Sequence, residues 1–155
     1  MKKLALSILT VFILASMSIA ATTQDALDFF NRYVAGANSY SPIIATMYSP
    51  NARIIRQVIK PDGTLVDRET DTARYISEMK KGQAVAKIRH YKNNYTNVSV
   101  QSLGNNTFKI SSLRQPSGET YKLKAYMIVQ QKSDGQWWII EEMMQTKVQL
   151  LLNAK

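Results

Sequence analysis

Apolar side chains follow two different periods along this chain, and the change of period divides it into elements. Three helices are expected from helical spacing, caps and stops, over residues 22–36, 41–49 and 71–82. Thr22 or Thr23 caps the first helix, and Gly36 ends it. Ser41 caps the second, while a pair of lysines followed by Gly82 gives the third helix a typical C-terminal end.

Outside these helices, apolar and polar positions alternate with the period of two that is typical of β-strands. Six strands are expected, over residues 52–59, 64–68, 86–102, 107–114, 121–131 and 137–148. The last strand begins with residues 137–140 (Trp-Trp-Ile-Ile), which leave no polar face and therefore indicate a central place in the sheet. This order of elements predicts an α+β fold in which antiparallel strands follow the helices.

The N-terminal residues 1–20 have the pattern of an export signal. Lys2 and Lys3 precede an uncharged apolar stretch, and Ser18 and Ala20 place small side chains where a signal peptidase requires them. The stretch is short against the roughly 20 apolar residues that span a bilayer. We expect cleavage after Ala20 and one mature domain over residues 21–155, in the periplasm or secreted. No later segment is apolar enough to span a membrane.

Charge and cysteine content narrow the range of partners. The formal net charge is +9, and removal of Lys2 and Lys3 lowers it to +7. The remaining Lys and Arg residues are spread out, and no nucleic-acid-binding motif occurs. We therefore expect a solvated basic surface and no nucleic-acid partner. The alternative is that the basic surface attracts other acidic partners. The absence of cysteine excludes disulfides and thiolate metal sites. We expect neither a metal nor a cofactor.

The order helix, helix, hairpin, helix and meander resembles the nuclear transport factor 2-like superfamily over the whole mature chain. Residues 47–52 (Met-Tyr-Ser-Pro-Asn-Ala) and residues 134–138 (Asp-Gly-Gln-Trp-Trp) carry the same resemblance. The resemblance implies a curved antiparallel sheet wrapped around three N-terminal helices, cone-shaped with a pocket at the wide end. Such folds host unrelated activities, so the fold alone does not give the function.

Residues 32–35 (Arg-Tyr-Val-Ala) resemble the first helix of the ketosteroid isomerases, one class of that superfamily, whose Tyr donates a hydrogen bond to a developing oxyanion. The resemblance places Tyr33 at that position, Arg56 where the class has its Asp base, and Met127 roughly where it has a protonated Asp. A guanidinium is always protonated, and Met has no proton to give, so the proton shuttle of that class is not supported. Tyr33 is then either a pocket hydroxyl or an ordinary core tyrosine.

Two further features are candidates for chemistry. His90 is the only histidine, and without a metal-ligand partner or a nucleophile elbow we interpret it as a strand residue with a satisfied hydrogen bond. Glu141 and Glu142 are neighbours on a strand, so at most one of them enters a pocket. We interpret Glu141 as the ion-pair partner of Arg56 or Lys124, with a general base as the alternative.

Two main functions remain open on these observations. The first is a non-catalytic domain whose pocket binds a small anionic or amphipathic ligand. Four residues are expected to line that pocket: Tyr33, Tyr48, Arg56 and Met127. The second is a protein-interaction or assembly module, such as a homodimer, which the apolar residues 137–140 and the tail run at residues 150–152 favour. An enzyme of the isomerase or hydrolase type is a third alternative, for which no base is identified.

Overall fold

The structure, a computed structural model, describes residues 20–152, so nearly all of the expected export signal lies outside the described residues. The helices are α1 (Thr23–Asn38), the short 3₁₀ helix η1 (Pro42–Met47), α2 (Thr72–Ile88) and the 3₁₀ helix η2 (Gln149–Leu152). The strands are β1 (Tyr48–Ile59), β2 (Leu65–Thr70), β3 (Asn93–Gly104), β4 (Thr107–Pro116), β5 (Leu123–Gln131) and β6 (Trp137–Thr146).

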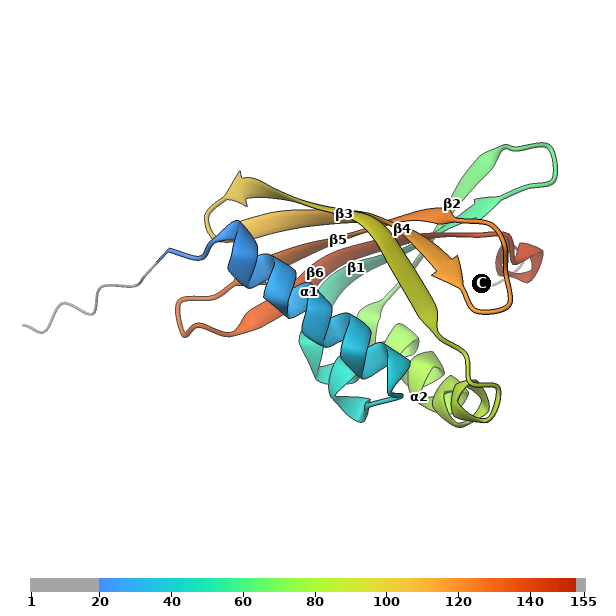
Figure 1. Cartoon of the computed structure of the whole chain (residues 1–155), viewed down its shortest axis with the longest axis horizontal. Coiled ribbons are helices and arrows are strands. Elements are labelled where there is room, and N and C mark those ends of the chain that lie inside the picture. The colour runs from blue at the N-terminus through green and yellow to red at the C-terminus, as the bar shows by residue number, and fades with distance from the viewer. Residues whose placement is uncertain (1–19, 153–155) are drawn as a thin grey trace, which may run out of the picture.

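The six strands form one curved sheet, with α1, η1 and α2 on one side of it (Figure 1). Its strand order is β2-β1-β6-β5-β4-β3. The α+β class and the curved sheet wrapped around N-terminal helices are therefore confirmed. All neighbouring strands are antiparallel except β1 and β6, which are parallel, because the chain returns through β2, α2 and the far strands before β6 pairs with β1. The sheet is thus mixed, and β6 is central, as its two-faced apolar start indicated.

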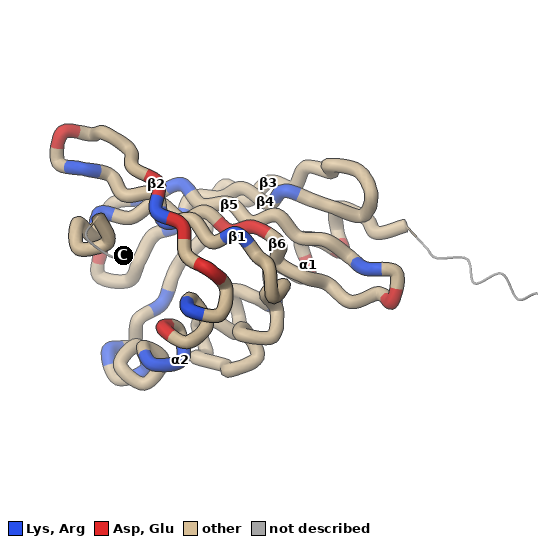
Figure 2. Tube along the Cα trace, turned by 180° about the vertical axis from the view of Figure 1, so that it is seen from behind, with Lys and Arg blue, Asp and Glu red and all other residues tan. Residues whose placement is uncertain are grey.

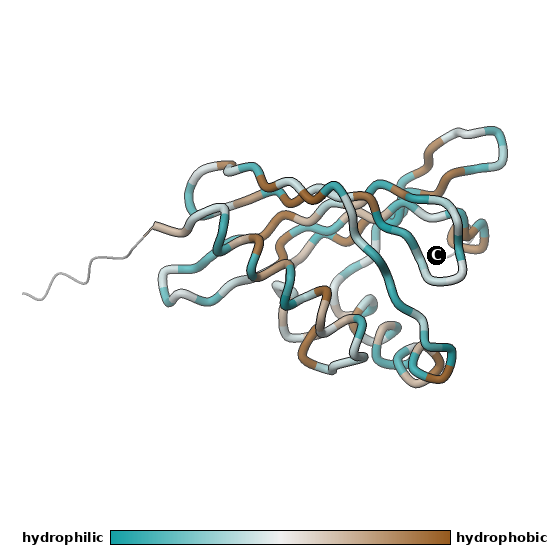
Figure 3. The backbone as a smooth tube through the Cα atoms, viewed as in Figure 1, coloured by the Kyte–Doolittle hydropathy of each residue, from teal (hydrophilic) through white to brown (hydrophobic). Residues whose placement is uncertain are grey.

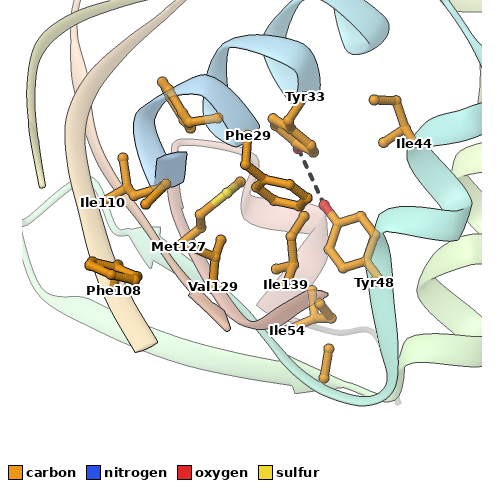
Figure 4. Close-up of a cluster of buried hydrophobic side chains, with 13 residues drawn as sticks. Phe29, Tyr33, Ile44, Tyr48, Ile54, Phe108, Ile110, Met127, Val129 and Ile139 are labelled. Atoms are coloured by element: carbon orange, nitrogen blue, oxygen red, sulfur yellow. Dashed lines mark hydrogen bonds between the residues drawn. The ribbon is translucent and has the colours of Figure 1, made fainter. Parts of the chain in front are cut away.

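The core lies between α1 and the inner face of the sheet (Figure 4). α1 buries one helical face, made of Ala26, Phe29, Phe30 and Tyr33. The ring of Phe29 stacks on Trp137 of β6 with centroids 5.8 Å apart. Burial of one large apolar side chain stabilises a fold by about 1.5–3 kcal/mol, so this helix face fixes α1 on the sheet. Apolar positions recur along α1 and the central strands in Figure 3.

The start of α1 agrees with the sequence prediction. Thr22 is its cap, and the Thr22 hydroxyl and the Asp25 carboxylate bond each other's backbone N–H groups in a capping box. The end differs slightly, because the helix runs past Gly36 to Asn38. Tyr40 then takes a left-handed conformation (φ 59°), which closes the helix in the way that Gly usually does.

The predicted end of the last long helix is wrong. α2 continues through Gly82 to Ile88, so the strand expected from residue 86 begins only at Asn93. The interpretation of His90 as a strand residue is also wrong, since it has a φ of 51° just after α2. Its N–H donates to Lys87 and that of Tyr91 to Ala86, the two bonds of a Schellman motif. A helix tolerates an internal Gly at a cost of about 1 kcal/mol, so Gly82 did not have to end it.

The basic residues do not gather on one element. Figure 2 shows Lys and Arg spread over strands, turns and α2, with Asp and Glu among them. Within residues 20–152, no helix is long and apolar enough to cross a membrane.

Candidate functional site

A buried carboxylate organises the interior beneath the C-terminal half of α1. Glu142 of β6 is fully buried, and its Oε2 accepts hydrogen bonds from the hydroxyls of Tyr48 (2.5 Å) and Tyr33 (3.1 Å). Nη2 of Arg56, on β1, lies 2.9 Å from Oε1. A buried charge is stable only when it is paired and hydrogen-bonded, and here one cation and two hydroxyls supply that environment. The geometry indicates an ionised glutamate held by Arg56.

The pairing of Arg56 with Glu142 leaves one oxygen poorly satisfied. Oε1 is close enough to Arg56 for an ion pair, but it accepts no well-directed hydrogen bond from any of residues 20–152. The guanidinium also lies over the ring of Tyr75, 4.8 Å from its centroid. Its Nη1 donates to the carbonyl of Ile55 at 3.2 Å. Arg56 is therefore held on several sides, and the carboxylate of Glu142 already balances its charge.

An irregularity in β6 decides which glutamate points inward. Val129 of β5 pairs with Ile139, whereas the preceding Ile128 pairs with Glu141, so Ile140 is an extra residue in β6. Without this bulge, Glu141 would share the inner face with Ile139, and the bulge gives that face to Glu142. Bulges are common next to functional sites because they redirect side chains in this way.

The interpretation of Glu141 as the partner of Arg56 or Lys124 is wrong for the same reason. Glu141 lies on the outer face, where its Oε2 is 3.5 Å from Nη1 of Arg53 and its Oε1 accepts the hydroxyl of Tyr126 at 2.6 Å. Burial and this hydrogen bond raise the pKa of Tyr126 to about 12. The residue that carries the inner network, Glu142, was named in the sequence only as the neighbour of Glu141.

Two tyrosine hydroxyls bond the carboxylate, and a third adjoins them. The oxygens of Tyr33 and Tyr48 are 3.2 Å apart (Figure 4), and that of Tyr75 lies 3.4 Å from Tyr48. Burial is the main reason that the pKa of Tyr33 and that of Tyr48 are raised well above their ordinary value, and the negative charge of Glu142 raises both further. The pKa of Tyr75 is raised by the same two causes. These hydroxyls therefore keep their protons at neutral pH.

A cavity of about 310 Å³ adjoins this network between α1, α2 and the sheet. Its walls include five of the eight tyrosines of the chain: Tyr33, Tyr40, Tyr75, Tyr91 and Tyr95. Apolar side chains complete the walls, among them Ile44, Met79, Ala86 and Met144. Ligand sites in proteins are typically concave, mostly apolar and supplied with a few polar groups, and this cavity has that composition.

Hydrogen bonds between elements hold the rim of the cavity. The side chain of Asn38, at the end of α1, donates to the carbonyl of Asn93 (3.0 Å) and accepts from its N–H (2.9 Å). The side-chain amide of Gln83, on α2, donates to the carbonyl of Tyr40. The end of α1 is therefore tied to both α2 and β3, which gives the opening a defined width.

A second buried arginine stands behind the Asn93 side of the cavity. Nη1 of Arg114 donates to Oδ1 of Asn93 (2.8 Å) and to the hydroxyl of Tyr91 (3.4 Å), and Nη2 donates to the carbonyl of Gln145 (2.8 Å). Unlike Arg56, it forms no ion pair with a carboxylate in the described part of the chain. Its charge is spread over neutral acceptors, so this wall of the site is electropositive.

The four residues expected to line a pocket take different places. Tyr33 contributes to the wall of the 310 Å³ cavity, while Tyr48 lies directly behind it in the Glu142 network. Arg56 borders a separate cavity of about 210 Å³ beside β2, and the ring of Tyr75 stands between the two cavities as a wall of both. Met127 belongs to the hydrophobic core, opposite Glu142 on the neighbouring strand.

Residues 20–152 contain no group of three or more His, Cys, Asp or Glu side chains that could hold a metal ion. His90 is exposed just after α2 and does not line the cavity.

Comparison with known proteins identifies the fold. No protein-family model matches the sequence, and no curated protein matches it. A nuclear transport factor 2-like protein of unknown function from Shewanella oneidensis is similar in structure, with a TM-score of 0.60, 14% identity and coverage of 80% of this chain and 98% of that one. A cystatin-like domain of unknown function from Nostoc punctiforme has a TM-score of 0.57 and 15% identity, over 84% of this chain and 81% of that one.

A third similar structure is a scytalone dehydratase of provisional assignment from Novosphingobium aromaticivorans, with a TM-score of 0.57 and 13% identity, over 78% of this chain and 80% of that one. Identities this low show the fold alone. The chain therefore has the nuclear transport factor 2-like, cystatin-like fold, as the element order of its sequence predicted. The functions of such neighbours do not transfer with the fold.

Proposed function

We propose that this protein is an exported, non-catalytic binding domain whose tyrosine-lined cavity holds a small amphipathic molecule. The observation that carries the proposal is the 310 Å³ cavity, which combines apolar walls with the hydroxyl network around Glu142. Export rests on the signal pattern of residues 1–20. An interior rich in tyrosine offers flat apolar surfaces and polar tips at once, which suits a ligand with the same mixed character.

The pairing of Arg56 removes the main argument for an anionic ligand and leaves the amphipathic alternative. The anionic alternative rested on Arg56 as the receiver of a carboxylate or phosphate. Arg56 already faces a carboxylate of the protein, 2.9 Å away, and borders the smaller cavity. A second anion there would have to compete with Glu142 for the same guanidinium.

The position of Glu142 supports binding more than catalysis. A general base must come within about 2.6–3.2 Å of the proton that it removes. Glu142 is fully buried and does not line the 310 Å³ cavity, and its Oε2 is occupied by two tyrosine hydroxyls. Glu142 would not contact a ligand in the cavity directly. Its role in this proposal is to position Tyr33, which does line the cavity.

The proposal is tested by native mass spectrometry of the mature protein after export from a bacterial host. We expect a co-purified small molecule that is released on denaturation. Ala86→Phe, which places a ring in the cavity, should abolish the bound mass. Ala84→Phe, on an exposed position of the same helix outside the cavity, is the matched control and should retain it. Equal occupancy in both variants would mean that the molecule binds elsewhere, and an empty wild-type protein would count against the proposal.

An interaction module remains the second candidate because several large apolar side chains are exposed. Leu150 in the tail run is 80% exposed and Ile88 at the end of α2 is 78% exposed, although Leu151 and Leu152 are half-buried. Exposed apolar groups of this size favour a protein partner. Sedimentation at roughly tens of micromolar, where a specific dimer should persist, distinguishes the two candidates. A monomer there would argue against a homodimer.

A further inference from the structure

Three of the five tyrosine hydroxyls that border the cavity share one orientation. Tyr33 and Tyr75 belong both to the cavity wall and to the network around Glu142, and Tyr91 borders the cavity near Arg114. A tyrosine hydroxyl has one proton to donate and two lone pairs that accept. The direction in which each proton points therefore decides what the wall offers to a ligand.

The protons of Tyr33 and Tyr48 point away from the cavity. An ionised carboxylate can only accept hydrogen bonds, so the hydroxyl of Tyr48, 2.5 Å from Oε2 of Glu142, donates to it. Tyr33 lies 3.1 Å from the same oxygen and 3.2 Å from the Tyr48 oxygen, and both of these partners lie within the network. With either partner, the single hydroxyl proton of Tyr33 is donated to a group of the protein and not to the cavity.

The same direction holds at Tyr75 and Tyr91. Because the Tyr48 proton is directed to Glu142, the 3.4 Å contact between Tyr48 and Tyr75 leaves Tyr75 as the donor. Tyr91 donates to Oδ1 of Asn93 at 3.3 Å, while its oxygen accepts from Arg114. Three of the five cavity tyrosines thus present lone pairs, not protons, to a molecule between them, while the buried hydroxyl of Tyr40 has no partner within residues 20–152.

On these grounds we infer that the cavity selects uncharged ring-sized molecules that carry a hydrogen-bond donor, such as an alcohol or phenol hydroxyl. The inference rests on the proposed binding function and names its ligand class. An anionic ligand would meet the lone pairs of the tyrosines. A cationic ligand would approach Arg114, which forms no ion pair in the described part of the chain and stands behind the Asn93 side of the cavity. A neutral donor meets neither penalty.

This arrangement reverses the role that the ketosteroid isomerase resemblance implies for Tyr33. In that class the hydroxyl donates to a developing oxyanion. Here Glu142 takes the proton of that hydroxyl, so Tyr33 is an acceptor toward the cavity. The reversal follows from a carboxylate behind the tyrosine, which is paired with Arg56.

A matched pair of probes tests the inference: β-naphthol, which has a hydroxyl donor, and its methyl ether, which has the same ring system and only an acceptor. Binding of each to the mature protein is measured by fluorescence titration. One hydrogen bond should make β-naphthol bind about three- to tenfold more tightly than the ether. Tyr33→Phe should reduce this ratio toward one, and Tyr91→Phe, at a more exposed position, should reduce it in part. Tyr126→Phe on the outer face is the control and should keep the wild-type ratio.

The outcomes separate this inference from the proposal beneath it. If neither probe binds, the cavity does not accept ring-sized molecules, and the proposed function fails together with its ligand class. If both bind at the cavity but the ether binds as tightly as β-naphthol or more tightly, the binding function stands and the donor preference is overturned. A preference that survives both Tyr33→Phe and Tyr91→Phe would also overturn it, since the donor would then be recognised elsewhere.

Discussion

Two Arg–Glu pairs join β1 to β6, one on each face of the sheet. On the outer face Arg53 meets Glu141, and the Arg53 side chain is 52% exposed. On the inner face Arg56 meets Glu142, where the side chains are 19% and 0% exposed. Each glutamate also accepts a tyrosine hydroxyl, from Tyr126 outside and from Tyr48 inside. The two pairs therefore have the same chemistry in different surroundings.

Surroundings decide what each pair does. Water screens the outer pair, and Arg53 shares its charge with Glu69 as well, so it contributes little to stability. The inner pair is shielded from water, and loss of either partner leaves a buried charge without compensation. The inner pair also orients the hydroxyls of Tyr33 and Tyr48 next to a cavity, whereas the outer pair borders solvent. Burial thus turns an ordinary ion pair into the centre of a hydrogen-bond network beside a cavity.

The largest effect is expected from removal of the inner carboxylate. Glu142→Ala leaves Arg56 buried and unpaired and leaves two tyrosine hydroxyls without their acceptor. The free energy of unfolding should fall by about 3–5 kcal/mol. Urea unfolding followed by tryptophan fluorescence measures this loss. A loss of stability similar to that of Glu141→Ala would show that the inner pair contributes no more to stability than the outer pair.

High pH should weaken the inner network next. The pKa values of Tyr33 and Tyr48 are raised in the folded state by burial and by Glu142, while the ordinary value is 10.0. Their contribution to stability is thus complete below about pH 10 and is lost as the pH rises further, because the unfolded chain ionises first. Each buried tyrosine should cost roughly 1 kcal/mol per pH unit there. Urea unfolding at increasing pH measures the slope, and a constant stability above pH 10 would contradict the buried network.

A double replacement separates charge from packing. Arg56→Met together with Glu142→Leu removes both buried charges and keeps apolar volume. We expect a net loss of no more than about 1–2 kcal/mol, well below that of Glu142→Ala alone, since replacement of a whole buried pair is often tolerated. The comparison uses the same urea unfolding assay. Losses that simply add would show that the two side chains are not coupled.

The smallest effect is expected on the outer face. Glu141→Ala should cost less than about a third of the loss at Glu142, since exposed ion pairs contribute little. Its effect should shrink further in about 1 M salt, where the screening length falls to about 3 Å. The effect of Glu142→Ala should change little with salt. If the stability losses of the two variants depended equally on salt, this would contradict the conclusion that one pair is solvent-exposed and the other is buried.

Much of the fold follows from the periods of the sequence. Helical spacing over residues 22–36 predicted α1, and residues 137–140 predicted a central strand, because both signals reflect burial of whole faces. The end of α2 could not be predicted in this way, since Gly82 and the lysines before it have the composition of a helix end, yet the helix runs on to a Schellman motif at His90. The left-handed His90, which ends α2 in place of a glycine, has no strong sequence signal.

The candidate site was predictable only in part. Tyr33, Tyr48 and Arg56 were named from a resemblance, and the structure brings them together around one carboxylate. That carboxylate was missed because alternation along β6 is interrupted by the extra residue Ile140, which a sequence does not reveal. The two adjacent glutamates were the available sequence signal for a buried carboxylate, because neighbouring residues of a strand point to opposite faces of the sheet.

The most direct test of a cavity organised by the inner pair is protein-observed NMR of the mature chain titrated with β-naphthol. The account predicts that amide shifts concentrate around the cavity, at Tyr33, Tyr75, Ala86 and Tyr95, and that the outer-face residues Arg53 and Glu141 stay unchanged. Shifts confined to the outer face, or to the exposed residues near Leu150, would contradict it and would favour the interaction module over the pocket.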